Sequence, residues 1–264
     1  MESSLEIDQE NIRFILRSLL DSLRSGPQPL ELEGVTTQEI SIRYRRLAIC
    51  SLLLDASTAS FYRLLSHSSQ AYLSVLRKVD WSTIASSYYL CASRALPFFD
   101  AIAASDLGTA RDIAQASALS WMEEDEYEDD FLYMRFLMEL TSDRQSPGLA
   151  RMLQRFRKVA AGSAPARLKV CEALIARDGA AFGAAMEELE LERQEELERL
   201  RRNSGTDPQR LSTEAHVFIE GLAVVRLAGM VGIETAHQYP GIPSLVVATS
   251  KAVKPDPQAW WTLA

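Results

Sequence analysis

The sequence predicts an all-α protein of about ten helices, stacked as antiparallel helical hairpins in a repeat-like bundle around a buried helix near the C-terminus. Three observations support this fold class. Residues 217–233 are apolar on almost every face, helical periodicity fills much of the remaining chain, and two turns between helices share one design. Strand-like alternation is lacking, apart from one candidate extended segment at residues 244–248.

The apolar run at residues 217–233 reads VFIEGLAVVRLAGMVGI and is interrupted only by Glu220 and Arg226. A surface helix has one apolar stripe, whereas a helix that is apolar all round is enclosed by other elements. A membrane span would need about 20 apolar residues, and each of these two charges would be costly within a bilayer. We therefore predict a buried central helix with the earlier helices packed around it.

The N-terminal part of the chain shows helical periodicity in several segments. Apolar residues at positions 12, 15, 16, 19, 20 and 23 recur at helical spacing, and a glycine and a proline at positions 26 and 27 end that helix. Further helices are predicted at residues 38–55, 61–78 and 81–95. In the first of these, we expect the arginines at positions 43, 45 and 46 to face solvent or a partner.

Two turns resemble each other and indicate stacked helical hairpins. Residues 103–110 and 174–182 each place an aspartate, Asp106 or Asp178, between two helical segments with a glycine close by. An aspartate at such a position caps the second helix by accepting a hydrogen bond from an N–H group of its first turn. The spacing between the turns is irregular, so the fold is repeat-like and not a true solenoid.

The chain is long enough for a sizeable core, and we predict a single domain over residues 1–264. Helices occupy residues 8–104, an acidic segment covers residues 119–131, and further helices follow at residues 131–233. Prolines mark residues 234–264 as an irregular tail, which Trp260 and Trp261 are expected to hold against the body of the protein.

The formal net charge of −8 argues against a nucleic-acid-binding protein, which needs a basic face. Cys50, Cys91 and Cys171 are odd in number and lie in apolar helical patterns, which indicates reduced core residues. The acidic N-terminal sequence MESSLEIDQE has no apolar stretch typical of a secretory signal. We expect a protein of the reducing cytoplasm that does not contact a membrane.

The acidic segment contains the most unusual stretch, WMEEDEYEDDF at residues 121–131, with seven carboxylates. A calcium loop would need a glycine for its turn, and the stretch has none. One interpretation is a helix start, since acids at the N-terminus of the helix containing Phe131 are favoured by the helix dipole. The other is a docking surface for a basic partner, and the two are compatible.

We predict that this docking surface combines carboxylates with two aromatic anchors, Trp121 and Tyr127. Like charges packed together repel one another, so a protein gains from such a cluster only if it binds a cation, binds a basic surface or increases solubility. Aromatic side chains among charges are common at interface hot spots. The predicted contact residues are Trp121, Glu123, Glu124, Asp125, Glu126, Tyr127, Glu128, Asp129 and Asp130.

Sequence patterns typical of catalysis or of cofactor binding are missing. His216 and Glu220 stand four residues apart, as metal ligands on one helix face can, but there is no HExxH motif, and a hydrogen-bonded core histidine is the preferred interpretation. There is no phosphate-binding glycine loop, GxSxG elbow or CxxC pair. We assign no catalytic, cofactor or metal site and predict that the protein is not an enzyme.

Four stretches together span most of the chain. They are LAICSLLLDASTASFYRLLSHSSQAYLSVL at residues 47–76, KVCEALIARDGAAFGAAMEELELERQEEL at 169–197, EGLAVVRLAGMVGI at 220–233 and YPGIPSLVV at 239–247. In combination they resemble the immunity protein 49 family of bacterial polymorphic-toxin systems. The resemblance implies a non-catalytic, all-helical protein that binds a cognate toxin domain and blocks it.

On this resemblance we expect a protein of interbacterial competition that occludes the active or substrate site of its toxin. A basic toxin, nuclease-like or otherwise acting on nucleic acid, is the expected partner, because an acidic surface would steer it into place. The alternative is a helical-repeat adaptor or regulator with a non-toxin protein partner. A third class, an all-helical enzyme with a metal between facing helices, usually shows paired ExxH motifs, which this sequence lacks.

Overall fold

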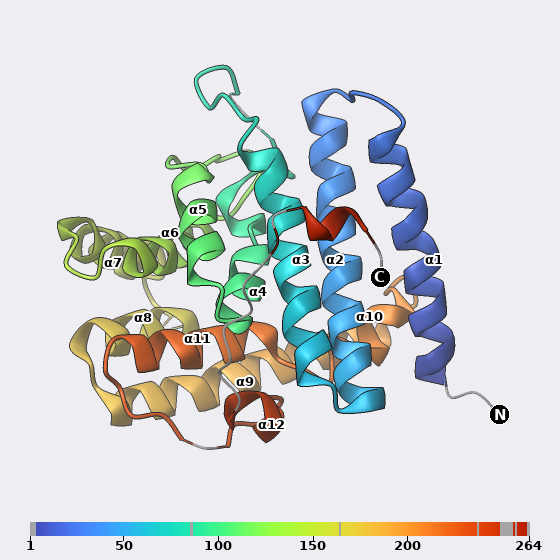
Figure 1. Cartoon of the computed structure of the whole chain (residues 1–264). Helices are drawn as coiled ribbons and strands as arrows, with labels where there is room; N and C mark the ends of the chain where they lie inside the picture. The colour runs from blue at the N-terminus through green and yellow to red at the C-terminus, as the bar shows by residue number, and fades with distance from the viewer. Residues whose placement is uncertain are drawn as a thin grey trace.

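The computed structural model describes residues 4–84, 87–163, 165–236, 238–248, 256 and 258–262. Over these residues the chain forms twelve α-helices and two short 3-10 helices, and its only β-structure is an isolated bridge between Tyr239 and Ile242 (Figure 1). The predicted all-α class is therefore confirmed.

The N-terminal helices stand side by side (Figure 1). Two residues separate α2 from α3, so these helices run antiparallel and pack along their length. The bounds are α1 (Ser4–Arg24), α2 (Leu30–Asp55), α3 (Thr58–Leu76), η1 (Ala92–Arg94), α4 (Pro97–Ala103) and α5 (Leu107–Ala116).

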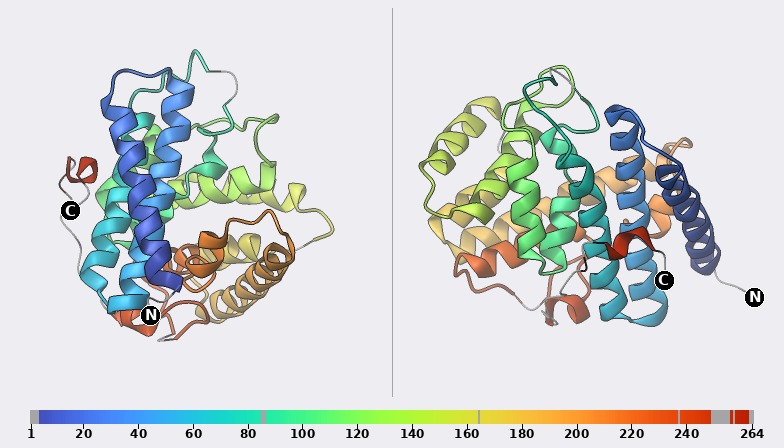
Figure 2. Two further views of the ribbon diagram at one scale, coloured as in Figure 1. Left: turned by 90° about the vertical axis from the view of Figure 1, so that its right-hand side faces the viewer. Right: turned by 45° about the horizontal axis from the view of Figure 1, so that its top comes forward.

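The C-terminal helices lie beside and below this row (Figures 1 and 2). We refer to residues 203–218, which contain α10, as the connector between α9 and α11. The bounds are α6 (Glu128–Ser142), α7 (Pro147–Val159), α8 (Ala166–Ala176), α9 (Gly179–Arg202), α10 (Pro208–Ser212), α11 (Ile219–Met230), α12 (Ser244–Ala248) and η2 (Ala259–Trp261).

The two predicted helix caps are confirmed. Asp106 accepts a hydrogen bond from the backbone N–H of Thr109 at 3.1 Å, and Asp178 accepts one from Ala181 at 3.0 Å. Each aspartate therefore begins the second helix of a hairpin, α4–α5 in one case and α8–α9 in the other.

Three predicted segments differ in the structure. α2 begins at Leu30 instead of residue 38, because acids in its first turn suit the helix dipole. No helix spans residues 81–95: the described residues there form turns and η1, and Pro97 begins α4, as proline can at a first helical turn. Residues 244–248 form the helix α12 and are not extended.

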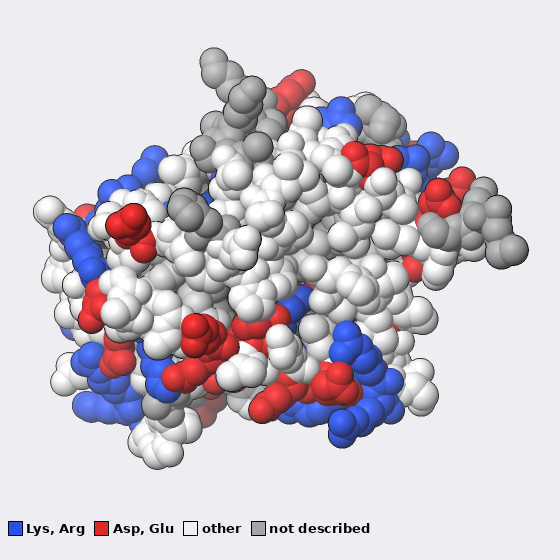
Figure 3. All heavy atoms as spheres, turned by 90° about the horizontal axis from the view of Figure 1, so that it is seen from below, with Lys and Arg blue, Asp and Glu red and all other residues white. Residues whose placement is uncertain are grey.

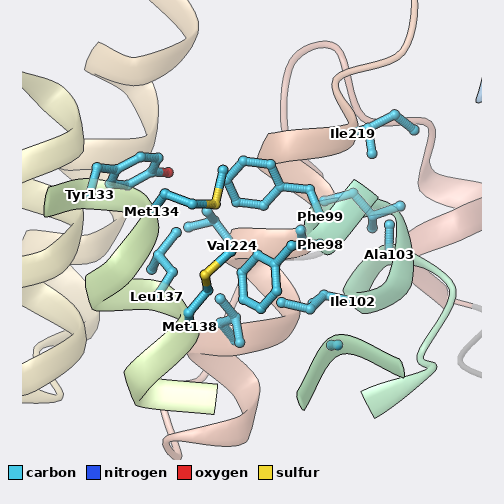
Figure 4. Close-up of a cluster of buried hydrophobic side chains, with 14 of the residues drawn as sticks. Phe98, Phe99, Ile102, Ala103, Tyr133, Met134, Leu137, Met138, Ile219 and Val224 are labelled. Atoms are coloured by element: carbon cyan, nitrogen blue, oxygen red, sulfur yellow. The ribbon is translucent and has the colours of Figure 1, made fainter. Parts of the chain in front are cut away.

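The predicted buried helix is α11, whose Leu222, Ala223 and Val224 have no exposed surface. It packs against α4 and α9 in the main core. Figure 4 shows a part of this core in which side chains of α4 meet those of α6 and α11: Phe98, Phe99 and Ile102 from α4, Met134, Leu137 and Met138 from α6, and Val224 from α11.

The expectation that the α2 arginines face solvent or a partner is wrong for Arg45 and Arg46, which are buried. Nε of Arg45 donates to Oδ1 of the buried Asp100 at 2.7 Å. Arg46 pairs with Asp207 at 2.5 Å and with Glu214 at 2.8 Å. Helical periodicity places these arginines inward, and carboxylates from α4 and the connector compensate their charges.

A second, smaller core lies between α1, α2 and α3, and Trp260 completes it. The Trp260 side chain is 2% exposed and stacks on Trp261 with ring centroids 4.1 Å apart. The Tyr44 hydroxyl donates a hydrogen bond to the Trp260 carbonyl. The predicted anchoring of the tail by these tryptophans is confirmed, and the three cysteines are free and buried as expected.

His67 makes the stability of the fold depend on pH. This α3 side chain is buried, its ring meets the Tyr44 ring edge-on at 5.3 Å, and its Nδ1 has no hydrogen-bond partner among the described residues. The pKa of His67 is lowered from 6.5 to about 4, mainly by burial and also by the charge of Arg63, while the charge of Asp256 opposes both.

We expect the contribution of neutral His67 to the free energy of unfolding to be complete above pH 6.5 and to be lost as the pH falls towards 4. Over that range the unfolded chain binds a proton at this histidine, whereas the folded chain excludes it. Between pH 6.5 and about 4, the free energy of unfolding should therefore fall by about 2 to 3 kcal/mol more in the native chain than in the His67→Gln variant. Urea denaturation at several pH values measures this. Parallel pH profiles for the two proteins would contradict the assignment.

Candidate functional site

A cleft of about 930 Å³ lies between segments that are far apart in the sequence. One side is lined by the acidic segment and by residues between Tyr88 and Leu96. The other side is lined by α9, the connector and the start of α11. In the left view of Figure 2, α9 and the connector lie below the chain that runs between α3 and α6. Arg45 of α2 and Phe99 of α4 also line the cleft.

The lining of the cleft is highly charged and negative overall. Sixteen of its 28 described lining residues are charged, ten of them carboxylates and six of them arginines. On the face seen from below, charged side chains of both signs are most dense along the lower edge of the picture and also lie at its left and upper right, while the middle is mostly uncharged (Figure 3). The negative excess of the cleft favours cationic groups in a ligand.

The acidic segment enters α6 at its end. Glu128, Asp129 and Asp130 form the first turn of this helix, where the dipole favours negative charge. The helix-start interpretation is therefore confirmed for these three residues. The preceding residues, from Trp121 to Tyr127, form turns and loops that border the cleft.

Glu126 holds the loop of the acidic segment in place. Its side chain is 9% exposed, and its carboxylate accepts hydrogen bonds from the backbone N–H groups of Ser93 at 2.7 Å and Met122 at 3.3 Å. The indole of the half-buried Trp121 donates to the Glu126 carbonyl at 2.9 Å. Trp121 and Glu126 thus make internal contacts that shape the loop.

Two further carboxylates of the acidic segment are paired within the protein. Glu128 forms a two-point ion pair with Arg155 at 2.5 and 2.8 Å. Asp130 accepts from Arg167 at 2.7 Å, and Arg167 also binds both carboxylate oxygens of Glu220 at 3.0 Å. Burial raises the pKa of Asp130, with Arg167 acting in the opposite direction, and the charge of Glu220 raises the pKa of Arg167.

Three of the remaining acids face outwards. Glu123, Glu124 and Asp129 are exposed and form no ion pair with any described residue, while Asp125 is half-buried. Tyr127 beside them is 80% exposed. The nine predicted contact residues therefore include a group that builds the segment and a group that is exposed to a partner, namely Glu123, Glu124, Asp129 and Tyr127.

The opposite side of the cleft was not predicted from the sequence. Glu192, Glu196 and Arg199 line the cleft from α9, within the range 131–233 for which the sequence predicted helices but no binding surface. Tyr88, 45% exposed, and Arg94 line it from a region predicted to be helical. No pattern in the sequence identifies which face of α9 borders the cleft.

The charged cleft is a candidate binding surface. No cluster of three or more histidine, cysteine, aspartate or glutamate side chains in the described residues is arranged to hold a metal ion. His216 is exposed in the turn before α11, so its assignment as a core histidine is wrong, and position 237 lies outside the described residues. Among the described helices, none combines the length and the apolar character that crossing a bilayer requires.

A family model for immunity protein 49 matches residues 46–245. The chain belongs to the immunity protein 49 family. The matched range runs from within α2 to within α12 and includes every residue of the cleft except Arg45. No curated protein and no solved structure matches this chain. The family resemblance expected from the four sequence stretches is therefore confirmed.

Glu126 and Glu124 provide a matched test of the division within the acidic segment. Glu126→Ala would leave two backbone N–H groups without their acceptor, so we expect the free energy of unfolding to fall by about 2 to 3 kcal/mol. Glu124→Ala removes an exposed carboxylate and should change it by less than about 0.5 kcal/mol. Urea denaturation of both variants measures the difference, and equal effects would show that Glu126 does not hold the loop.

Proposed function

We propose that this member of the immunity protein 49 family binds a cognate toxin domain and neutralises it by occluding the active or substrate site. The toxin is a basic protein, nuclease-like or otherwise acting on nucleic acid. The protein works by binding in the cytoplasm and not by catalysis. The observation that carries the proposal is the group of exposed, unpaired carboxylates next to Tyr127 at the edge of a negative cleft.

Charge supports a basic partner on two grounds. Exposed carboxylates attract a positively charged protein over about a Debye length, which raises the association rate and orients the encounter. A protein that acts on nucleic acid needs a basic substrate groove. An inhibitor whose carboxylates bind in that groove would exclude the nucleic-acid substrate. An inhibitor of this kind requires only a complementary surface on a stable scaffold.

Tyr127 supports a protein partner in particular. Exposed aromatic side chains are enriched at hot spots, where a large rigid ring becomes buried on binding. Tyr127 is 80% exposed, while its neighbours Trp121 and Glu126 hold the backbone beneath it. Because the loop backbone at this position is held, a partner can bury the Tyr127 ring without also having to order the loop.

The first test is co-expression of this chain in bacteria with the polymorphic-toxin domain encoded next to it. We expect the cells to survive and the two proteins to purify as a complex. Continued killing without a complex would favour the alternative, a helical-repeat adaptor with a non-toxin partner, for which an unrelated neighbouring operon would be further support.

The second test reverses the three exposed acids, Glu123→Lys, Glu124→Lys and Asp129→Lys, in one variant. Asp130 stays unchanged because it pairs with Arg167 inside the protein. We expect toxin affinity at low salt to fall at least about 100-fold, with a smaller dependence on salt than in the native chain.

A control variant carries the same change of charge away from the cleft, at three exposed acids of α1 and α2. Its substitutions are Glu10→Lys, Glu31→Lys and Asp55→Lys, and none of these residues lines the cleft. We expect this control to bind nearly as well as the native chain. Equal affinity of both triple variants would remove the acidic segment from the interface.

A further inference from the structure

We propose that the toxin inserts a protruding basic element, a loop or helix end bearing arginine or lysine, into the cleft between the acidic segment and α9. The inference deepens the proposed function and rests on it. It assigns the second side of the interface to α9, which begins at Gly179, 48 residues after the end of the acidic segment at residue 131. It also distinguishes insertion into the cleft from docking on the outer edge of the acidic segment.

The volume and lining of the cleft fit part of a protein better than a small molecule. Its volume of about 930 Å³ is close to the upper end of the ~300–1,000 Å³ that encloses a whole small ligand. Small-molecule sites are lined mainly by apolar side chains, whereas more than half of these lining residues are charged. A polar element of several residues matches both the space and its chemistry.

Three arginines of the cleft are already neutralised by carboxylates of the protein and therefore offer little to an anionic ligand. Arg45 pairs with Asp100 at 2.7 Å, and Arg167 pairs with Glu220 at 3.0 Å. The guanidinium of Arg193 lies 4.8 Å from the centre of the Phe218 ring and pairs with a carboxylate of its own helix. The charges of these arginines are thus compensated within the protein. The excess negative charge of the cleft is carried by carboxylates nearer the surface.

The α9 side of the cleft can exchange its contacts for those of a cationic partner. Glu196 is exposed and pairs with Arg210 at 2.8 Å, with about half of the glutamate side chain accessible to solvent. An exposed pair of this kind contributes about 0 to 1 kcal/mol to stability. A cation from a partner can therefore bind the Glu196 carboxylate without a large loss within the fold.

Both sides of the cleft also carry an arginine that would limit the approach of a basic element. Arg199 of α9 and Arg94 of η1 are exposed, and neither has a carboxylate partner among the described residues. Arg94 instead lies over the Tyr88 ring at 4.2 Å. A basic element must pass between these cations, so replacing Arg199 by an acid should strengthen binding if the element enters the cleft.

The test uses three single variants of the full chain. Glu196→Lys reverses a charge inside the cleft. Glu198→Lys is its matched control, because Glu198 lies on the same helix, is also exposed and paired with a nearby arginine, and does not line the cleft. Arg199→Glu adds a negative charge to the cleft. Urea denaturation first establishes that all three variants fold with native stability.

Binding is measured by surface plasmon resonance with the toxin domain encoded next to this chain, recovered from the co-expressed complex. We expect Glu196→Lys to weaken binding at least about tenfold, Glu198→Lys to change it less than about threefold, and Arg199→Glu to strengthen it about threefold or more. A complex of native affinity for Glu196→Lys, with the acidic-segment triple variant impaired, would overturn insertion and leave the proposed function standing.

Two other outcomes also overturn the inference. If Glu196→Lys and Glu198→Lys weaken binding equally, α9 acts only through its long-range charge and the toxin does not enter the cleft. If the toxin binds all variants as it binds the native chain, including the acidic-segment triple variant, both the insertion and the docking role of that segment are wrong.

Discussion

The ion pair between Arg45 and Asp100 is the contact on which the arrangement of the N-terminal helices depends. Both side chains are buried, and a buried charge without its partner costs about 3 to 5 kcal/mol. Ser68 of α3 donates to the second carboxylate oxygen at 2.6 Å, and Arg45 also donates to the Leu96 carbonyl at 2.8 Å. The pair therefore fixes α2, α3 and α4 in one register and positions Leu96 and Phe99 at the cleft.

A second network, which is half-buried, fixes the C-terminal side. Arg167 of α8 binds Asp130 of α6 and Glu220 of α11, and its guanidinium lies 4.9 Å from the centre of the Tyr133 ring. Arg46 ties the connector to α2 in a similar way. The elements that border the cleft are thus held by charged contacts inside the protein. A surface held in this way loses little conformational freedom when a partner binds, which favours affinity.

The caps at Asp106 and Asp178 and the apolar α11 could be predicted because neighbouring residues determine them. The burial of Arg45 could not, since its carboxylate partner lies 55 residues away and helical periodicity contains no information about it. For the site, the sequence shows many carboxylates, but ion pairs with Arg155 and Arg167 decide which of them are free. The α9 side was missed because a solvated helix face has the same composition whether it borders a cleft or open water.

The smaller core joins the two ends of the described chain, because Trp260 packs with residues of α1, α2 and α3. During synthesis, the N-terminal helices leave the ribosome first. The smaller core between these helices stays incomplete until residue 260 has also emerged. Every helix of the main core is synthesised earlier. The smaller core is therefore the last to close, and nascent chains carry an uncovered apolar surface on their first helices until it does.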